Sequence, residues 1–164
     1  MQTMLCRLMF AWLCATLLLV GCDQKKIEQL EEGLSTEADV RRQFGEPAAI
    51  YPEADGSRVL EYPRQPEGQT NYFITIGPDG KMSALRQVLK ESNFAKVSAG
   101  MSKTEVRRLL GMPARRQTYA LKGEEVWDWR YANEGEARMF SVTFDKEGKV
   151  LTSSSAPDPK LDAR

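Results

Sequence analysis

Histidine is absent from the 164 residues of this sequence. Without imidazole, nucleophilic sites of the Ser-His-Asp and Cys-His kinds are excluded, as are zinc sites that use histidine. Carboxylate, lysine and tyrosine chemistry remains, yet no glycine-rich phosphate loop or metal-ligand spacing accompanies those residues. A catalytic pair of acids could come only from carboxylates that exposed strands and turns also collect: Glu124, Glu125, Asp128, Glu134 and Glu136. We therefore expect a protein that is not an enzyme and that holds no metal or cofactor.

Neither sign of charge is in excess, since 23 basic residues stand against 23 acidic ones. Removal of the segment 1–21 would take away one basic residue, Arg7, and no acid, which leaves 23 − 1 = 22 basic against 23 acidic groups and a net charge near −1. A surface that binds nucleic acid carries a strong positive excess. Nucleic acid is therefore not an expected partner.

Cysteine is scarce and confined to the N-terminus, at Cys6, Cys14 and Cys22. No disulfide can form within a chain that begins at Cys22. Arg7 precedes a mostly apolar run, Leu8–Val20, which is the charge-then-apolar pattern of a secretory signal. That run is too short to span a bilayer comfortably, because a spanning helix needs about 20 apolar residues.

The end of this run, Leu19-Val20-Gly21-Cys22, resembles the lipobox of bacterial lipoproteins, in which a cysteine is lipidated and freed by cleavage. The resemblance implies a signal peptide at residues 1–21 and a covalent lipid on Cys22. Acyl chains would then hold the mature protein on a membrane that it does not cross. An uncleaved anchor helix or an ordinary signal peptide is the alternative interpretation.

Asp23 directly follows the predicted lipidated cysteine. In enteric bacteria, aspartate at this position is linked to retention of a lipoprotein in the inner membrane. We therefore identify Asp23 as a candidate sorting residue.

The remainder of the sequence repeats itself. Gly33 is echoed by Gly100, at an offset of 100 − 33 = 67, and Val40–Pro47 returns as Val106–Pro113 at an offset of 66. Further matches follow in register: Leu60-Glu61-Tyr62 with Trp127-Asp128-Trp129, Tyr72–Ile76 with Phe140–Phe144, and Gly80-Lys81-Met82 with Gly148-Lys149-Val150. We therefore expect two tandem copies of one structural unit.

Each copy predicts a pair of short helices followed by antiparallel strands. Ser102 and Glu105 have the spacing of a capping box, and Gly111 ends that helix. Shorter amphipathic segments precede the two main helices, at Ile27–Glu32 and Phe94–Ala99. Alternating apolar residues then predict strands, and hairpin turns are predicted at Asp79-Gly80, Asn133-Glu134-Gly135 and Glu147-Gly148.

The predicted fold class is α+β, with two tandem units that each pack a helix pair on a three- to four-stranded antiparallel sheet. Residues 22–89 form the first unit and residues 90–153 the second. Each has only about 65 residues and no disulfide, a size at which a lone core is marginally stable, so the units should pack together. Residues 154–164 are polar and interrupted by proline, which predicts a disordered tail.

Two sets of side chains are candidates for contacts. Four arginines on the main helices could bind lipid phosphate or an acidic partner, because guanidinium groups suit phosphate: Arg41, Arg42, Arg107 and Arg108. A solvated helix face is the alternative explanation. Trp127, Trp129 and Tyr131 share one strand face. We expect them in the core, since a strand face covered by helices needs large apolar residues.

A lipobox, a helix motif, a Trp-x-Trp-x-Tyr strand and a terminal hairpin together resemble the SmpA/OmlA, or BamE-like, family of lipoproteins. The helix motif is Gly-Met-Ser-x-x-Glu-Val-Arg-x-Leu-Leu-Gly-x-Pro at residues 100–113. The match is clearest over Phe94–Thr152 and legible over Ile27–Leu89. It implies a BamE-like fold and a role in outer-membrane β-barrel protein assembly. The tandem arrangement also looks like the β-lactamase inhibitor protein fold, in which two such units form one concave binding surface.

The resemblance implies a non-catalytic interaction or scaffold module that faces the periplasm. Its partners would be membrane lipid, through Cys22, and envelope proteins, with the β-barrel assembly machinery among the candidates. The resemblance favours the outer membrane, whereas Asp23 suggests the inner one. A periplasmic inhibitor or ligand-sensing module that uses the concave surface between the units is the alternative function. Burial of Tyr62, Trp127 and Trp129 would remove the motive for that alternative.

Overall fold

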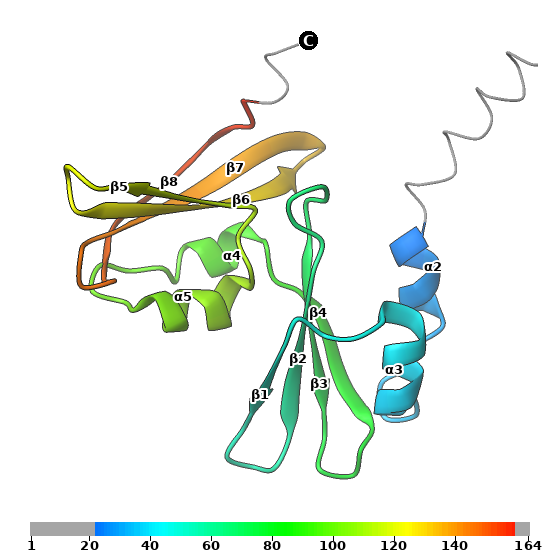
Figure 1. Ribbon diagram of the computed structural model, residues 1–164. Helices are drawn as coiled ribbons and strands as arrows, with labels where there is room; N and C mark the ends of the chain where they lie inside the picture. Colours follow the sequence, from blue (N-terminus) through cyan, green and yellow to red (C-terminus); the bar gives the residue numbers. More distant parts are fainter. Residues whose placement is uncertain (1–21, 160–164) are drawn as a thin grey trace, which may run out of the picture.

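The computed structural model describes residues 22–159, so the predicted signal peptide at 1–21 lies outside the described residues. Two units lie side by side, and each combines short helices with a four-stranded antiparallel sheet (Figure 1). The strand orders are β1-β2-β3-β4 in the first sheet and β5-β6-β7-β8 in the second. The predicted α+β fold with two tandem units is confirmed.

The first unit contains helices α2 and α3 and strands β1 to β4. Their bounds are α2 Cys22–Glu28, α3 Glu37–Phe44, β1 Ala49–Pro52, β2 Arg58–Pro63, β3 Asn71–Ile76 and β4 Met82–Gln87. The second unit contains helices α4 and α5 and strands β5 to β8. Their bounds are α4 Glu91–Phe94, α5 Lys103–Leu110, β5 Arg115–Tyr119, β6 Glu124–Asn133, β7 Glu136–Phe144 and β8 Val150–Pro157.

Both main helices begin with a capping box. In α5 the Ser102 hydroxyl accepts from the Glu105 N–H at 3.2 Å, and the Ser102 N–H donates to the Glu105 carboxylate at 2.7 Å. In α3 the same reciprocal pair is Thr36 with Asp39. The offset between the two caps is 102 − 36 = 66, so the extra residue of the first copy lies before the cap. The boxes satisfy backbone N–H groups that a helix start otherwise leaves unpaired.

Replacement of the α5 cap, Ser102→Ala, should lower the free energy of unfolding by about 1 kcal/mol, because the Glu105 N–H loses its acceptor. Urea denaturation followed by circular dichroism measures this change. Thr104→Ala is the matched control, since Thr104 is exposed on the same helix and lies outside the box. Equal stability losses in the two variants would contradict the assigned role of Ser102.

The capping box of α3 should also appear in a titration. Hydrogen bonds from the Thr36 hydroxyl and backbone lower the pKa of Asp39 to about 2, from an ordinary 3.8. A carboxyl with a lowered pKa in the folded state stabilises the fold above pH about 4, and this contribution is lost as the pH falls toward 2. Carbon-13 NMR should therefore find Asp39 titrating near pH 2, and nearer 3.8 in Thr36→Val. An Asp39 midpoint near 3.8 in the unaltered protein would contradict this account.

Each unit has its own hydrophobic core between its sheet and its main helix. In the first, Val40 and Phe44 of α3 pack on Leu60, Ile74 and other inward residues of the sheet. In the second, Val106 and Leu110 of α5 pack on Trp129 and its neighbours in β6 and β7. The prediction that Trp127, Trp129 and Tyr131 belong to the core is confirmed, since all three are buried.

Several predicted boundaries differ from the structure. The helices expected at Ile27–Glu32 and Phe94–Ala99 begin earlier, as α2 and α4. Leu89, predicted as the last residue of the first unit, packs in the second core. Strands β1 and β5 were not predicted, because Arg115–Tyr119 and Ala49–Pro52 lack a clear apolar alternation and are held by pairing with β6 and β2.

The prediction of a disordered tail from residue 154 is wrong over residues 154–157, which belong to β8. Their polar side chains gave no strand pattern, yet their backbone pairs with β7 from Phe144↔Val150 to Arg138↔Pro157. Asp158 follows and is buried, and its carboxylate accepts from Arg130 Nε at 2.6 Å. Residues 160–164 lie outside the described part of the chain.

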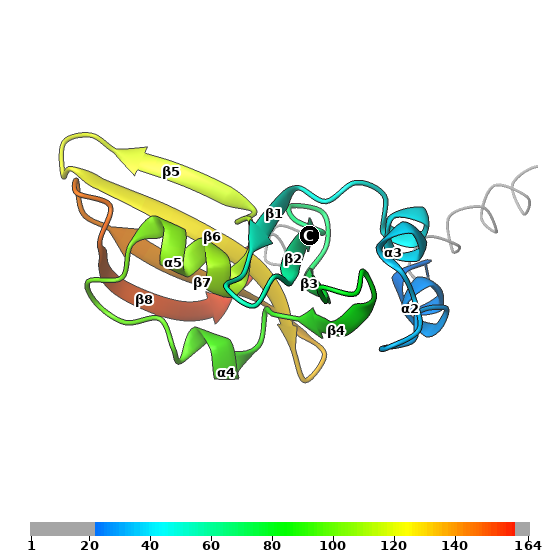
Figure 2. The ribbon, with the colours of Figure 1, turned by 90° about the horizontal axis from the view of Figure 1, so that it is seen from below.

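None of the helices described in residues 22–159 combines the length and the apolar composition that a membrane span requires. In Figure 2, α2 and α3 lie at one end of the molecule, the second unit lies at the other, and the first sheet stands between them. The first sheet therefore has neighbours on both faces. Its inner face packs on α3, and its outer face meets the end of α5 through the contacts described next.

Candidate functional site

The two units meet at a buried carboxylate on the outer face of the first sheet. Strand alternation places Glu61 of β2 opposite its core neighbours Leu60 and Tyr62, and its side chain is 0% exposed. Glu61 Oε1 accepts from the Met112 backbone N–H at 2.6 Å, just beyond α5. Glu61 Oε2 lies 3.3 Å from Arg107 of α5 and accepts from the Tyr51 hydroxyl at 2.6 Å.

Tyr51 stays protonated and donates in this cluster. Burial, followed by the hydrogen bond to Glu61, raises the pKa of Tyr51 to about 12. The Tyr51 ring also faces the second unit, since Arg108 Cζ lies 4.8 Å from its centroid. Arg108 is in turn paired with Glu53. One carboxylate thus gathers a phenol from its own sheet, and an amide and a guanidinium from the other unit.

Asn71 makes a second connection between the units. This residue of β3 is 0% exposed, and its amide donates to the carbonyls of Leu110 at 2.8 Å and of Met112 at 2.9 Å. The Leu110 carbonyl is the last of α5 and has no partner within the helix. Gly111 lies between Leu110 and Met112 at φ 76°, and a Cβ there would come within 2.9 Å of Asn71 Nδ2. Glycine is required at this position by the backbone and by the close approach together.

The β2–β3 loop of the first unit forms a third connection. The Gln65 side chain donates to the Arg130 carbonyl at 2.8 Å and accepts from the Arg130 N–H at 3.2 Å. Strand β5 pairs with β6 only as far as Asp128, so the backbone of β6 is open at Arg130. The Gln65 amide thus fills a place beside β6 where no strand lies.

Removal of the buried carboxylate should lower the free energy of unfolding of the protein. Glu61→Ala leaves Arg107 and the Met112 N–H without an acceptor, which should cost about 3 kcal/mol in the free energy of unfolding. Glu53→Ala is the matched control, because it breaks the pair to the next arginine of α5 at a half-exposed site, where the loss should stay below about 1 kcal/mol. Urea denaturation of the two variants compares these losses. Equal losses would show that burial of Glu61 does not hold the units together.

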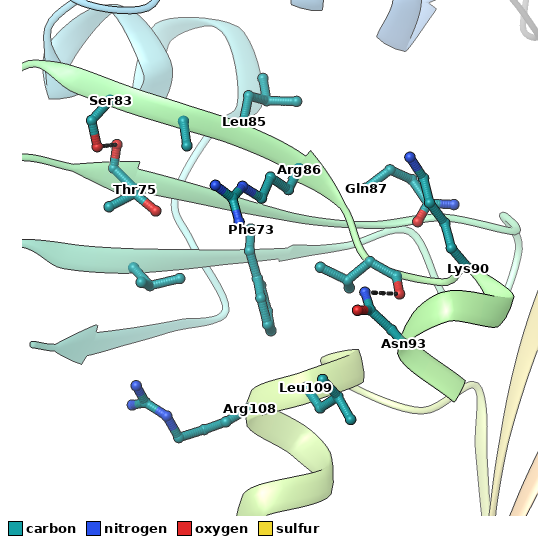
Figure 3. Close-up of a pocket in the computed structure, with 13 residues that line it drawn as sticks. Phe73, Thr75, Ser83, Leu85, Arg86, Gln87, Lys90, Asn93, Arg108 and Leu109 are labelled. Carbon is teal, nitrogen blue, oxygen red and sulfur yellow. Dashed lines mark hydrogen bonds between the residues drawn. The ribbon is translucent and has the colours of Figure 1, made fainter. Parts of the chain in front are cut away.

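Beside these contacts lies a groove of about 610 Å³ between the outer face of the first sheet and helices α4 and α5 (Figure 3). Phe73 points from β3 toward the end of α5 that carries Arg108 and Leu109. Arg86 and Lys90 lie along the β4 side of the groove and are exposed. Apolar and cationic groups therefore share one surface.

The lining of the groove carries positive charge only. Arg86, Lys90 and Arg108 line it, and no aspartate or glutamate does. Arg108 is paired with Glu53, whereas Arg86 and Lys90 have no ion pair among residues 22–159. Gln87 Oε1, also at the groove, is buried without a hydrogen-bond partner in the described part of the chain. The groove thus suits a ligand that brings carboxylates and an apolar group.

The structure gives each predicted contact arginine a carboxylate within the chain. Arg41 pairs with Glu37 and Glu46, and Arg42 pairs with Asp39. Arg107 and Arg108 reach across to Glu61 and Glu53. The four do not form one site, because Arg41 and Arg42 lie on α3, on the far side of the first sheet from α5. Contacts of these arginines to lipid or partner stay a prediction.

The acid-rich stretch does not bring Glu125 and Asp128 together. They lie on opposite faces of β6, since their separation of three positions along a strand is odd. Glu125 binds Lys103 and the Trp127 indole N–H, and the hydrogen bond from Lys103 is the largest cause of its lowered pKa. Asp128 is buried and binds Arg115 Nε at 2.8 Å and the Ser141 hydroxyl at 2.6 Å. Among residues 22–159, no group of three or more metal-ligating side chains is placed to hold a metal ion.

Sequence reasoning missed the residues that join the units. Glu61 and Asp128 match as repeat equivalents, at an offset of 128 − 61 = 67, but strand alternation with apolar neighbours assigns each acid to an exposed face. Both are in fact almost fully buried. The available signal was an acid at the same place in both copies, between two large apolar residues, on a strand that both copies predict.

Comparison with known proteins places the second unit in a family context. The model of the outer membrane protein assembly factor BamE domain matches residues 87–154. A solved structure described as the osmotically inducible lipoprotein OsmE is 30% identical, with 46% of this chain and 81% of that chain covered and a TM-score of 0.38. No curated protein matches the chain.

Two further solved structures are similar at lower identity. A DUF4309 family protein, YjgB of Bacillus subtilis subsp. subtilis str. 168, is 19% identical, with 79% of this chain and 83% of that chain covered and a TM-score of 0.32. A protein of Streptococcus mutans described as a β-lactamase inhibitor protein is 11% identical, with 84% and 97% covered and a TM-score of 0.37.

Proposed function

Because the chain belongs to the BamE-like family through its domain at residues 87–154, we propose that it is a non-catalytic, lipid-anchored interaction module of the cell envelope. The module faces the periplasm and is held by acyl chains on Cys22. The single observation that carries the proposal is the BamE domain, folded as one complete helix-and-sheet unit. Its partners are envelope proteins, with the β-barrel assembly machinery as the first candidate, and its membrane is the outer one.

The groove is the surface that this proposal assigns to a partner. Its three cations and its apolar floor around Phe73 and Leu109 are complementary to an acidic segment that carries an apolar side chain. Arg86 and Lys90 are exposed and unpaired among residues 22–159, so a partner would not have to break an existing ion pair to reach them. A partner seated here would touch both units at once.

The alternative function, a periplasmic inhibitor or ligand-sensing module that uses the concave surface between the two units, loses the aromatic residues that motivated it. Tyr62, Trp127 and Trp129 are 1%, 5% and 0% exposed. Their polar groups form hydrogen bonds within the chain; for example, the Trp129 N–H donates to the Gly111 carbonyl at 2.9 Å. A concave aromatic surface of the kind that alternative needs cannot come from these residues.

Site-specific photocrosslinking in native membranes tests the proposal. A photoreactive phenylalanine analogue at Ser83, an exposed residue of the groove, should crosslink the full-length chain to envelope proteins that mass spectrometry then identifies. The same analogue at Lys146, an exposed residue of the β7–β8 turn outside the groove, is the matched control. Charge reversal at Arg86 and Lys90 together should reduce crosslinking at Ser83 several-fold.

Three results would count against the proposal. An unmodified thiol on Cys22, found by mass spectrometry of the native product, would remove the lipid anchor. Equal crosslinking from Ser83 and Lys146 would contradict the assignment of the groove as the partner surface. Crosslinking at Ser83 that is unchanged by the charge reversal would contradict it as well. Crosslinks to no envelope protein would remove the partner class.

A further inference from the structure

The residue next to the proposed lipidated cysteine is held by the fold. Asp23 lies in the first turn of α2, and both of its carboxylate oxygens accept from one guanidinium. Arg64 Nε lies 2.8 Å from Oδ2, and Arg64 Nη2 lies 3.1 Å from Oδ1. Such a two-point pair fixes orientation as well as charge. The partners are 41 residues apart in sequence, so the pair depends on the folded unit.

Arg64 is itself held in place from two sides. Its Cζ lies 5.2 Å from the centroid of the Phe44 ring, at the end of α3. Its backbone N–H donates to the Thr70 carbonyl at 3.0 Å, which closes the β2–β3 loop. Side-chain exposure is 24% for Arg64 and 30% for Asp23, so neither group is freely solvated. The Phe44 ring thus contacts the guanidinium independently of Asp23, and the loop hydrogen bond fixes the backbone that carries it.

The chain stays attached to the unit beyond Asp23. Ile27 and Leu30 pack against the first core, and Gln29 accepts a hydrogen bond from Gln43 of α3 at 2.7 Å. Glu32 accepts from the Leu85 N–H of β4 at 3.2 Å. No loose linker separates residue 23 from the body of the protein among the residues that the structure describes. Asp23 therefore presents itself as part of a surface and not as part of a free N-terminal segment.

A carboxylate in this state is a poor sorting signal. A sorting system that reads aspartate after the lipidated cysteine needs access to its oxygens and its negative charge, and here the guanidinium occupies both oxygens and neutralises the charge. We propose that the Asp23–Arg64 pair masks the inner-membrane retention signal, so that the folded lipoprotein proceeds to the outer membrane. This inference rests on the proposed lipidation of Cys22. It also reconciles Asp23 with the outer-membrane location that the family suggests.

Fractionation of membranes from an enteric bacterium that makes the full-length chain tests the inference. On a sucrose density gradient the unaltered protein should sediment with the outer membrane, and Arg64→Ala should move most of it to the inner membrane. Adding Asp23→Ser to Arg64→Ala should return it to the outer membrane, which a purely structural role of Arg64 would not do. Arg42→Ala is the matched control, because it breaks an ion pair of the same unit, with Asp39, and leaves Asp23 untouched.

Each other outcome overturns the masking role. An unaltered protein found in the inner membrane would show that Asp23 is still read, and Arg64→Ala protein that stays in the outer membrane would show that nothing is masked. A double variant that remains in the inner membrane with Arg64→Ala would show that Arg64 acts through something other than Asp23. Mass spectrometry of Cys22 in every variant separates these results from failure of the proposed function, since loss of the lipid would release the protein from both membranes.

Discussion

The arrangement of the two units depends on one carboxylate, that of Glu61, which is buried away from solvent. A carboxylate buried at 0% exposure is tolerated only when its oxygens are fully engaged, because removal from water costs several kcal/mol per ion. The donors to Glu61 come from Tyr51 in its own sheet and from Arg107 and Met112 in the other unit. The first sheet thus needs the end of α5, and α5 is seated where the carbonyl of its last residue, Leu110, accepts from Asn71. The groove beside α5 follows from this seating.

The second unit also has a buried acid, but all the donors described for it lie within that unit. Asp128 takes the place of Glu61, and its donors, Arg115 and Ser141, both belong to its own sheet. Ser141 stands where the first unit has Phe73, at an offset of 141 − 73 = 68, so this outer-face position is apolar in the unit that meets another unit there and polar in the unit that does not. Terminal units of a tandem array commonly close the array with a polar outer face. Divergence between the copies therefore follows from their positions in the pair.

Local signals account for what the sequence predicted well. The Ser102 capping box, the Asn133–Gly135 hairpin and the core aromatics each depend on residues only a few positions apart in the sequence. What the sequence did not reveal depends on distant partners. Met112 reaches Glu61 across 51 residues, and Arg64 reaches Asp23 across 41. Strands β5 and β8 are polar and exposed, so only the ladders to β6 and β7 define them.

The two faces of the first sheet contact different parts of the protein. Helix α2, whose first residue is the proposed anchor, shares its side of the sheet with α3, and α5 with the BamE domain meets the other side (Figure 1). A lipid on Cys22 would therefore reach the BamE domain only through the first unit. Because Arg64 holds Asp23 and the neighbouring Gln65 holds Arg130 of β6, one loop, β2–β3, contacts both the anchor end and the second unit. Under the proposed anchoring, the first unit fixes the distance and direction of the BamE domain from the membrane, a role that a flexible linker of equal length could not perform.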